Sequence, residues 1–430
     1  MEPTHHTTPA PDEPGVRPPR SVLVVGAGLA GTQTAAALRG HGFTGHLTVL
    51  GAEGLPPYDR PPLSKELFTR RAPAWLTDEL GVDLSQLADE LVLGDAARHL
   101  EHPVPLADHS VSVATASGRR VHADVVVLAC GSVPVRPAGW EDAVTLHGAT
   151  DADHLRSRLV PGARLVCIGA GWIGAEVAGA AAAAGCEVTV IEAAGVPLHR
   201  QLGPTVGAHL SRWYDAAGVT LVTGAPVVGV DASGVHLGTT TPRAIPADVV
   251  LAAVGARPAT DWLADALPRD ARGAIRVDAR GRVVETGTVA GGTLFAVGDC
   301  ATRADPVWDQ VPGGHWSAAL LDPDAVAREI LGLEPGAGHA PYVFSTQLGH
   351  DLALFGLPDP VTDSVVLRGD PAGAGWAALY VSPAGLVTGM FVVDSPKDVA
   401  AARRMMVGGP VKLDLLRAAD PQVSLRATLV

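Results

Sequence analysis

The sequence predicts an α/β protein that has two doubly wound units and a smaller C-terminal α+β unit. Three observations lead to this prediction. One succession of strand, glycine turn, helix and strand occurs twice, two continuous apolar runs each end at a glycine, and the segment from residue 342 onward shows short strand patterns before a helix. At roughly 100 to 200 residues per domain, 430 residues suffice for three such units.

The repeated succession begins with a short apolar strand. This strand leads into a turn with glycines at its first, third and sixth positions, then into an alanine-rich segment with helical character, and then into a second apolar strand. The first copy comprises Ser21–Val25, Gly26–Gly31, the segment to Gly40, and His46–Leu50. The second copy comprises Arg164–Ile168, Gly169–Gly174, the segment to Gly185, and Glu187–Ile191. Two copies in one chain indicate a duplicated α/β unit.

Further apolar runs show no alternation of polar and apolar residues. They are Asp124–Gly131 and Asp248–Gly255, and such runs are typical of strands that are buried on both faces of a parallel sheet. A third run, Thr293–Val297, precedes Gly298-Asp299-Cys300 and a helical stretch around Ala325–Leu331. We expect these runs to be central strands of two parallel sheets.

These patterns divide the chain into parts. A Pro/Gly-rich joint after Gly332 separates the C-terminal unit, which turns helical at Pro396–Val407. The predicted parts are a disordered tail at 1–20, a first unit at 21–140 and 263–335, a second unit at 141–262, and the α+β unit at 336–430.

The composition is that of a globular, acidic protein. Hydrophobic residues make up 47% of the chain and charged residues 18%, and the formal net charge of −13 argues against general nucleic-acid binding. Only Lys65, Lys397 and Lys412 are lysines among 32 basic residues. The first twenty residues lack the apolar core of a secretory signal, and no stretch is long enough to span a membrane, so we expect a cytoplasmic protein.

The cysteines and histidines form no recognisable metal pattern. The four cysteines, Cys130, Cys167, Cys186 and Cys300, contain no C-x-x-C pair, and the 16 histidines contain no H-E-x-x-H. We therefore expect free thiols and no metal site.

The glycine turns carry the first functional signal. In a G-x-G-x-x-G turn between a strand and a helix, the first glycine makes the tight turn, the second lets the backbone approach a pyrophosphate, and the third lets the helix pack on the strand. The N-terminus of the helix then offers free N–H groups to the phosphates. We therefore expect two dinucleotide sites, one at each copy.

Acidic residues after the second strands indicate which dinucleotides bind. Glu192 follows the strand of the second copy, where a carboxylate accepts ribose hydroxyls and repels a 2′-phosphate, which favours NADH over NADPH. In the first copy Glu53 is the acid within reach.

Several longer motifs add a family resemblance. The segments are Pro57–Lys65 (PYDRPPLSK), Gly171–Ala178 (GWIGAEVA), Thr293–Ala301 (TLFAVGDCA), the His315-Trp316 pair, Pro341–Gly349 (PYVFSTQLG) and Ser395–Met405 (SPKDVAAARRM). With these segments the chain, from Ser21 onward, resembles the FAD-dependent ferredoxin reductases of oxygenase systems, such as putidaredoxin and rubredoxin reductases. These proteins have a glutathione reductase-like fold, which they share with apoptosis-inducing factor.

The resemblance implies that the first copy binds FAD and the second NADH. It also implies that Lys65 lies beside the flavin and pairs with Glu176, that Asp299 accepts a hydrogen bond from the ribityl chain, and that Trp316 shapes the flavin edge. The predicted FAD residues are Gly26, Gly28, Leu29, Ala30, Gly31, Glu53, Arg60, Lys65, Ala129, Gly131, Arg136, Gly298, Asp299, His315 and Trp316. The predicted NADH residues are Gly169, Gly171, Trp172, Ile173, Gly174, Glu192, Arg200 and Gly255.

The sequence departs from the family pattern at a few positions. They are Ala52, Cys130, Val133, Gly314 and Asp322. These positions flank the predicted flavin site, so we expect changed contacts around FAD.

The predicted activity is hydride transfer from NADH to FAD, followed by one-electron transfer to a ferredoxin that serves a cytochrome P450 or another oxygenase. The first unit has no C-x-x-x-x-C pair, so an external one-electron carrier is favoured over an internal disulfide. A basic patch must receive an acidic ferredoxin, and Arg70-Arg71 and Arg403-Arg404 are the candidates. Alternatives are an NADH oxidase or quinone reductase, and a redox-sensing interaction protein that resembles apoptosis-inducing factor.

Overall fold

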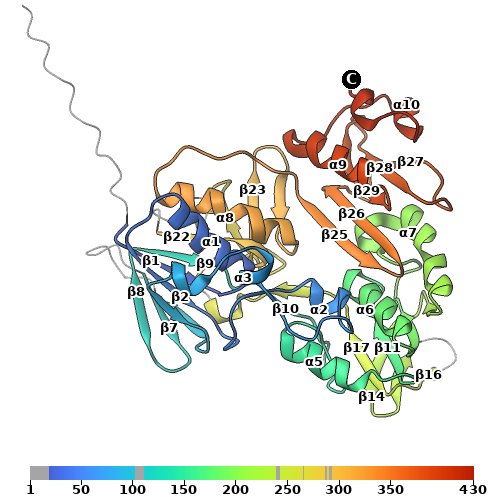
Figure 1. Ribbon diagram of the computed structural model, residues 1–430, viewed down its shortest axis with the longest axis horizontal. Helices are drawn as coiled ribbons and strands as arrows, with labels where there is room; N and C mark the ends of the chain where they lie inside the picture. Colours follow the sequence, from blue (N-terminus) through green and yellow to red (C-terminus); the bar gives the residue numbers. More distant parts are fainter. Residues whose placement is uncertain (1–18, 102–110, 239–242, 265, 286–287, 290–292) are drawn as a thin grey trace, which may run out of the picture.

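The computed structural model describes residues 19–101, 111–238, 243–264, 266–285, 288–289 and 293–430 (Figure 1). Most of the predicted tail, residues 1–18, lies outside this range. Two parallel sheets and one antiparallel sheet organise the described chain. This arrangement confirms the predicted fold class.

The first parallel sheet is built around the strand that precedes Gly26. Its strands, in spatial order, are β22 (Leu294–Ala296), β9 (Val125–Leu128), β1 (Ser21–Val25), β2 (His46–Leu50) and β5 (Glu90–Val92). Val22 and Val24 contribute to the core on the α1 and α8 side, whereas Leu23 and Val25 contribute to a second core on the opposite face. Burial on both faces explains why the strand sequences show no alternation.

The second parallel sheet repeats this plan with four strands. They are β13 (Thr220–Val222), β12 (Glu187–Ile191), β11 (Arg164–Ile168) and β17 (Val249–Ala252). The two segments that cross between the parallel sheets pair with each other as antiparallel strands, β10 (Ser132–Pro134) and β18 (Ala256–Pro258). This pairing ties the ends of β9 and β17 together.

Smaller sheets cover the parallel ones. Three have three strands each: β6 (Ala97–Glu101), β7 (Val111–Thr115) and β8 (Arg120–Ala123); β14 (Val227–Asp231), β15 (Gly234–Leu237) and β16 (Arg243–Ile245); and β19 (Ile275–Val277), β23 (Ala301–Asp305) and β24 (Asp309–Pro312). Two are short pairs: β3 (Tyr58–Asp59) with β4 (Ala74–Trp75), and β20 (Val284–Glu285) with β21 (Thr288–Val289).

The helices vary from single turns to five turns. They are α1 (Leu29–Gly40), α2 (Pro62–Lys65), α3 (Leu76–Glu79), α4 (Leu84–Leu87), α5 (Ala149–Arg158), α6 (Trp172–Ala183), α7 (His199–Ala216), α8 (Trp316–Ile330), α9 (Pro396–Met405) and α10 (Leu415–Ala419). Helix α8 begins well before the predicted stretch and continues through Pro323. Its apolar residues Ala318, Val326 and Ala327 are buried, and α8 packs along α1, so this packing holds both halves of the helix.

The third glycine of each turn explains the tight start of the helices. A Cβ atom on Gly31 would lie 1.8 Å from the carbonyl oxygen of Gly26, and one on Gly174 would lie 2.0 Å from that of Gly169. Any side chain at either position would therefore push the helix away from its strand. The same close approach at both copies supports the duplication that the sequence predicted.

The C-terminal sheet is antiparallel and packs against the second unit. Its strands, in order, are β25 (Tyr342–Gln347), β26 (His350–Gly356), β29 (Val387–Val393), β28 (Trp376–Val381) and β27 (Ser364–Arg368). Trp376 and Phe391 share one hydrophobic core with Trp213 of α7, and the Tyr380 hydroxyl donates to the Leu202 carbonyl at 2.7 Å. Figure 1 shows the β25–β26 hairpin extending toward α6 and α7.

The predicted boundaries of the three units remain our proposal. Sheet membership supports it, because β22 joins the first sheet although it follows the second sheet in the sequence. Among the described residues, no helix is long and apolar enough to cross a membrane.

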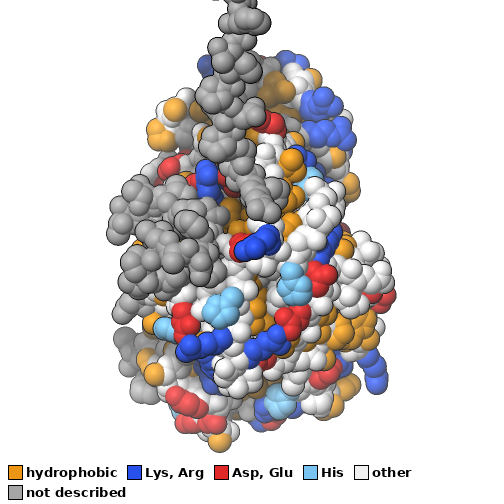
Figure 2. Space-filling view, turned by 90° about the vertical axis from the view of Figure 1, so that its left-hand side faces the viewer, with side chains coloured by type: hydrophobic (Ala, Val, Ile, Leu, Met, Phe, Trp, Pro, Cys, Tyr) orange, Lys and Arg blue, Asp and Glu red, His pale blue; other side chains and the backbone are white. Residues whose placement is uncertain are grey.

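Charges are paired over much of the first unit's surface. Arg39 lies 2.7 Å from Asp89, and Arg120 lies 3.1 Å from Glu101. Figure 2, which faces the end of the molecule that carries β8, shows basic and acidic side chains intermingled there. The described residues at this end therefore form no broad basic field.

Candidate active site

The N-termini of α1 and α6 are open. Gly28 and Gly171 are the N-cap residues, neither helix has a side-chain cap, and a Cβ atom on either glycine would meet nothing within 4 Å. Free N–H groups at the start of a helix attract anions. The chain thus provides two cradles that fit the diphosphate of a dinucleotide.

The first residues of these helices differ in exposure. Ala30 is buried, and a Cβ atom on Gly298 would lie 2.9 Å from that of Ala30, so the Gly298-Asp299 turn lies against the start of α1. Ile173 is 44% exposed, and Leu29 and Trp172 are half-buried. The structure therefore brings Gly298 to the first cradle, whereas Ile173 remains accessible at the second.

Asp299 lies at the end of β22 beside the end of β9. The Ser132 hydroxyl donates to its carboxylate at 2.8 Å. Gly131, with φ +71°, makes the turn between β9 and β10, and the Ala129 carbonyl lies against Gly26. Four of the predicted flavin residues, Gly26, Ala129, Gly131 and Asp299, thus gather at one edge of the first sheet.

Glu53 and Arg60, both predicted to contact FAD, contact each other. Arg60 forms an ion pair with Glu53, and the Tyr58 hydroxyl donates to the Glu53 carboxylate at 2.6 Å. Burial works to raise the pKa of Glu53, but the Arg60 charge and the two hydrogen bonds outweigh it and lower the pKa. Glu53 is therefore a carboxylate held by a cation, and Ala52 beside it is exposed.

Lys65 and Glu176 form the central pair of the site. The Lys65 Nζ lies 3.5 Å from Glu176 Oε1, and the two side chains are 14% and 5% exposed. The Ser64 and Ser345 hydroxyls each donate to the Glu176 carboxylate at 2.5 Å. Lys65 also lies over the Phe344 ring, with Nζ 4.1 Å from the centroid. Residues of α2, α6 and β25 therefore meet here.

Trp316 is held beside this pair. Its indole N–H donates to Asp59 Oδ1 at 2.8 Å, and its ring meets that of Phe344 edge to face, with the centroids 5.5 Å apart. Burial raises the pKa of Asp59, while the Trp316 hydrogen bond and the Lys65 charge oppose the rise. Trp316 and Lys65 thus share Asp59 and Phe344 as neighbours.

His315 directs one nitrogen to the start of α8. Its Nδ1 accepts from the Ala318 N–H at 3.2 Å, whereas its Nε2 is buried without a hydrogen-bond partner among the described residues. Burial lowers the pKa of His315, so its neutral form is favoured. A buried nitrogen without a partner fits a site that receives a polar ligand atom.

Glu192 is fixed at the end of β12. Its carboxylate accepts the Ala170 N–H at 2.8 Å and the Ala194 N–H at 2.9 Å. Arg200, Arg136 and Gly255 are exposed, and for the two arginines the described part of the chain offers no ion pair. The structure therefore places Glu192 at the second glycine turn without bringing Arg200 or Arg136 to a charged partner.

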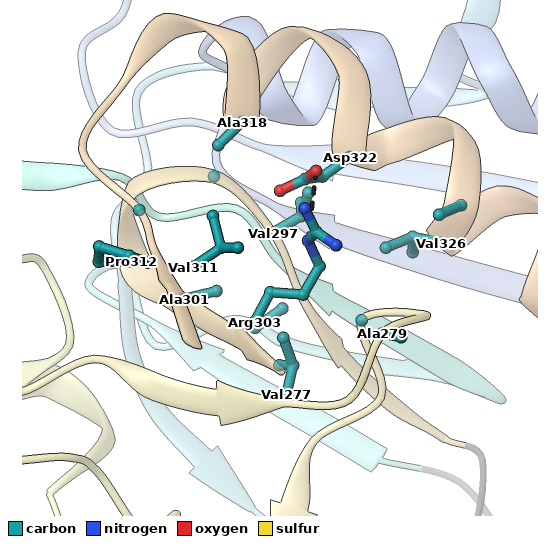
Figure 3. A pocket seen from close by; sticks show the side chains of 15 residues that line it. Val277, Ala279, Val297, Ala301, Arg303, Val311, Pro312, Ala318, Asp322 and Val326 are labelled. Atoms are coloured by element: carbon teal, nitrogen blue, oxygen red, sulfur yellow. Dashed lines mark ion pairs between the residues drawn. The ribbon is translucent and has the colours of Figure 1, made fainter. Parts of the chain in front are cut away.

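Asp322 serves an internal charge network. Its carboxylate lies 2.9 Å from His339 and 3.4 Å from Arg303, which also pairs with Asp305. Figure 3 shows Arg303 and Asp322 directed at each other across a small pocket between β23 and α8, with Val277 and Val311 among its walls. The acid at this position is thus balanced within the protein.

The other departures have simple surroundings. Cys130 is half-buried, Cys300 is buried, and all four cysteines are free thiols. Val133 lies on β10 opposite Arg257 of β18, and Gly314 is exposed with φ +97° just before α8. No group of three or more metal-ligating side chains occurs among the described residues.

Sequence reasoning missed several side chains of this site. Ser64, Asp59 and Phe344 lie in motifs that carried the resemblance, and so does Ser345, yet none was assigned a role. Their position in these motifs was the signal that could have identified them as site residues. What it did not reveal is that segments 57–65 and 341–349 meet at Glu176.

The fold and site define a class of protein with two dinucleotide cradles, a buried lysine–glutamate pair and a C-terminal sheet that closes the site. The sequence profile of the pyridine nucleotide-disulphide oxidoreductases matches residues 20–319, and that of the reductase C-terminal domain matches residues 342–429. The chain belongs to the pyridine nucleotide-disulphide oxidoreductase family.

Individual relatives match almost the whole chain. The ferredoxin–NAD(+) reductase component of the anthranilate 1,2-dioxygenase system of Burkholderia cepacia is 32% identical over 95% of this chain and 98% of its own length. The crystal structure of Fdr9 has a TM-score of 0.83 at 35% identity and covers 94% of this chain and 99% of that one. The covalent putidaredoxin reductase–putidaredoxin complex has a TM-score of 0.83 at 26% identity, with 95% and 97% covered. These matches confirm the resemblance that the motifs predicted.

Proposed function

We propose that this protein is an NADH-dependent, FAD-containing ferredoxin reductase. The observation that carries the proposal is the buried Lys65–Glu176 pair, which joins α2 to α6 and is contacted by β25 of the C-terminal sheet. Relatives that match nearly the full chain are named ferredoxin–NAD(+) reductases, which supports the same activity.

The first cradle and its neighbours would hold FAD. The diphosphate would meet the N–H groups of α1 at Gly28–Ala30, and Asp299, His315 and Gly131 would line the remainder. Asp299 would accept a hydrogen bond beside the one that it accepts from Ser132. Arg60 would act through its ion pair with Glu53 rather than as a free cation.

The second cradle would hold NADH at the N-terminus of α6. The exposed Ile173 would border the bound nucleotide, and Glu192 would accept the ribose hydroxyls. Its two backbone donors keep the carboxylate in place. Arg200 and Gly255, both exposed, would line the outer part of this site.

FAD held in the first cradle would supply the redox chemistry that this junction needs, uptake of an electron pair as hydride and release of single electrons. Lys65 contributes a fixed positive charge that stabilises negative charge beside it in a site shielded from water. Glu176 balances that charge, and the Phe344 ring, which Trp316 meets edge to face, lies against the ammonium. Lys65 therefore acts electrostatically and is not itself a proton carrier.

The electron acceptor would be a ferredoxin. Arg403 is exposed on α9 and lies over the Tyr342 ring, with its guanidinium carbon 5.3 Å from the centroid, and Tyr342 in turn meets Trp316. Arg70 is instead neutralised by Glu66 and Glu79. Of the two predicted patches, the proposal therefore assigns docking to Arg403-Arg404.

The terminal partner would be an oxygenase in the cytoplasm. The curated relatives belong to anthranilate, p-cumate and benzene dioxygenase systems, which supports a dioxygenase more directly than a cytochrome P450. A P450 remains the second possibility, because a reductase of the CYP199A2 system of Rhodopseudomonas palustris has a similar structure at 27% identity.

Purification and turnover test the activity. The protein should be yellow, and anaerobic NADH should bleach it and then reduce a [2Fe–2S] ferredoxin much faster than oxygen or a small quinone. Comparable turnover with oxygen or quinone would instead favour the oxidase or quinone-reductase alternative. A colourless protein that binds no FAD would exclude all of these activities.

Charge reversal tests the docking site. Arg403→Glu should raise the apparent KM for ferredoxin while NADH-to-ferricyanide turnover stays unchanged, because ferricyanide needs no docking surface. Arg71→Glu, on the other predicted patch, is the matched control and should leave both unchanged. If Arg71→Glu alone raised the KM, the assignment to α9 would be wrong.

A further inference from the structure

The Glu176 carboxylate is held by three parts of the chain at once. Ser64 and Lys65 reach it from α2, and Ser345 reaches it from β25 of the C-terminal sheet. Glu176 itself lies on α6 and is 6% exposed. Each carboxylate oxygen therefore accepts one hydroxyl, and Oε1 also faces the ammonium.

The contact between β25 and α6 depends on a missing side chain. Gly179 lies one turn after Glu176 on α6, and a Cβ atom there would be 2.9 Å from the Leu348 backbone nitrogen. The end of β25 can therefore lie directly on α6. This close approach brings Ser345 within hydrogen-bond distance of Glu176.

Gln347 determines which way the Ser345 hydroxyl points. Its amide Nε2 donates to Ser345 Oγ at 3.0 Å, and both side chains are buried, at 3% and 2% exposed. A hydroxyl has a single proton, so an oxygen that accepts from Gln347 directs that proton at Glu176 Oε1. The arrangement favours the carboxylate as an acceptor and disfavours the protonated acid.

We propose that Ser345 and Gln347 are positioning residues of the reaction centre: they hold Glu176 as an ionised acceptor and, through it, hold Lys65 in place. The C-terminal sheet thus completes the electrostatics of a site whose cofactors lie in the other two units. This inference rests on the proposed function, because it concerns the reaction only if Lys65 lies beside the bound flavin.

The groups around Glu176 determine the pH at which its carboxyl ionises. Burial raises the pKa of Glu176, and Lys65, Ser345 and Ser64 each lower it again. Lys65 is the charged group that faces it among the described residues, and Asp59 lies near Lys65. Removing the Ser345 hydroxyl removes a contribution that lowers the pKa, so the pKa of Glu176 rises and the ionised pair persists only at higher pH.

The test is Ser345→Ala in the FAD-loaded protein, with Thr346→Ala as the matched control. Thr346 is the next residue on β25, but it is exposed and donates to Asp351. Infrared spectra recorded across pH, with the spectrum of Glu176→Gln subtracted, report the carboxylic-acid band of Glu176 itself. A hydrogen bond to a charged group corresponds to about one to two pH units, so Ser345→Ala should raise this midpoint by about that amount.

A second readout connects the midpoint to the reaction. The acid limb of flavin bleaching by NADH should move upward together with the infrared midpoint in Ser345→Ala and remain unmoved in Thr346→Ala. Gln347→Leu, which keeps the hydroxyl but removes its orienting donor, should give a smaller upward shift and serves if Ser345→Ala does not fold. An unmoved infrared midpoint in the folded variant overturns the proposal.

The two possible failures can be told apart. A shifted infrared midpoint with an unmoved acid limb would show that Ser345 holds Glu176 but that the pair does not govern the reaction, which also overturns the positioning role. A wild-type protein that binds FAD but is not bleached by NADH would contradict the proposed function instead, whatever the infrared midpoint does.

Discussion

Replacing Lys65 by methionine should destabilise the folded protein because it leaves Glu176 buried without its cation. The two charges are 3.5 Å apart with side chains 14% and 5% exposed. At an effective dielectric constant of about 20, two unit charges at this distance attract by about 5 kcal/mol. Methionine keeps the length and apolar stem of lysine, so the change removes the charge with little loss of packing. Breaking one side of a buried pair typically costs about 3–5 kcal/mol.

The deficit should depend on pH in a defined direction. Loss of the ammonium removes the largest contribution that lowers the pKa of Glu176, so that pKa rises further. A carboxyl whose folded-state pKa lies above its unfolded value supports folding at low pH, and this stability is lost as the pH rises through the folded-state pKa. Lys65→Met should therefore be nearly as stable as wild type near pH 4–5, roughly the unfolded pKa of a glutamate, and markedly weaker near pH 8.

Urea unfolding at several pH values measures this effect through a double-mutant cycle. The cycle combines Lys65→Met, Glu176→Gln and the double variant, and the coupling is compared within one transition because a chain with several units need not unfold in two states. The double variant should recover most of the lost stability at pH 8, since no buried charge remains. A coupling within about 0.5 kcal/mol of zero at pH 8 would refute the assignment of Lys65 and Glu176 as a buried ion pair.

Three further predictions concern the cradles, the nucleotide and the C-terminal unit. Gly28→Ala should retain the thermal stability of the FAD-free protein but weaken FAD retention in equilibrium dialysis. Gly31→Ala should instead lower the thermal stability itself, because its Cβ would clash with the Gly26 carbonyl. Equal effects of the two variants on thermal stability would contradict this prediction. Glu192→Ser should lower kcat/KM for NADH about tenfold or more in steady-state assays and should narrow the preference for NADH over NADPH. An unchanged ratio of kcat/KM for NADH to that for NADPH would argue against the role of Glu192 in binding the ribose. Arg368→Met leaves Asp398 buried without its partner. It should lower the free energy of unfolding by about 3–5 kcal/mol and accelerate hydrogen exchange in residues 415–428. Unchanged exchange in these residues would contradict the prediction.

The two parallel sheets could be predicted from the sequence because their signals are local. The turns at Gly26 and Gly169 follow strands of unbroken apolar residues, and each element of the repeat is short and continuous. The start of α8 was harder to predict, since Pro323 interrupts the helical pattern and the first half is held by tertiary contacts, among them the packing on α1 and the Trp316–Asp59 hydrogen bond. Long-range packing of this kind leaves no periodic signal in one segment.

The sequence predicted many residues of the site but few of the contacts between them. Lys65 and Glu176 were paired by the resemblance, and the structure brings them together. Glu53 was predicted as the acid within reach of the first cradle, and the sequence did not indicate that Arg60 forms an ion pair with it. Such pairings join positions whose distance in space follows from loop geometry, and neither composition nor spacing encodes it. Ser345 is the extreme case, since 169 residues separate it from Glu176.

The scarcity of lysine in this chain acquires a physical reason at position 65. Arginine binds a carboxylate best as a planar fork that uses both oxygens, but Ser64 and Ser345 already donate to the two oxygens of Glu176. A compact ammonium can still approach Oε1 while it lies over the Phe344 ring. A guanidinium fork would need the remaining acceptor site of both oxygens at once, whereas the ammonium needs only that of Oε1. The two serines therefore favour a cation that makes a single contact here, even in a chain that otherwise uses arginine for nearly all of its positive charge.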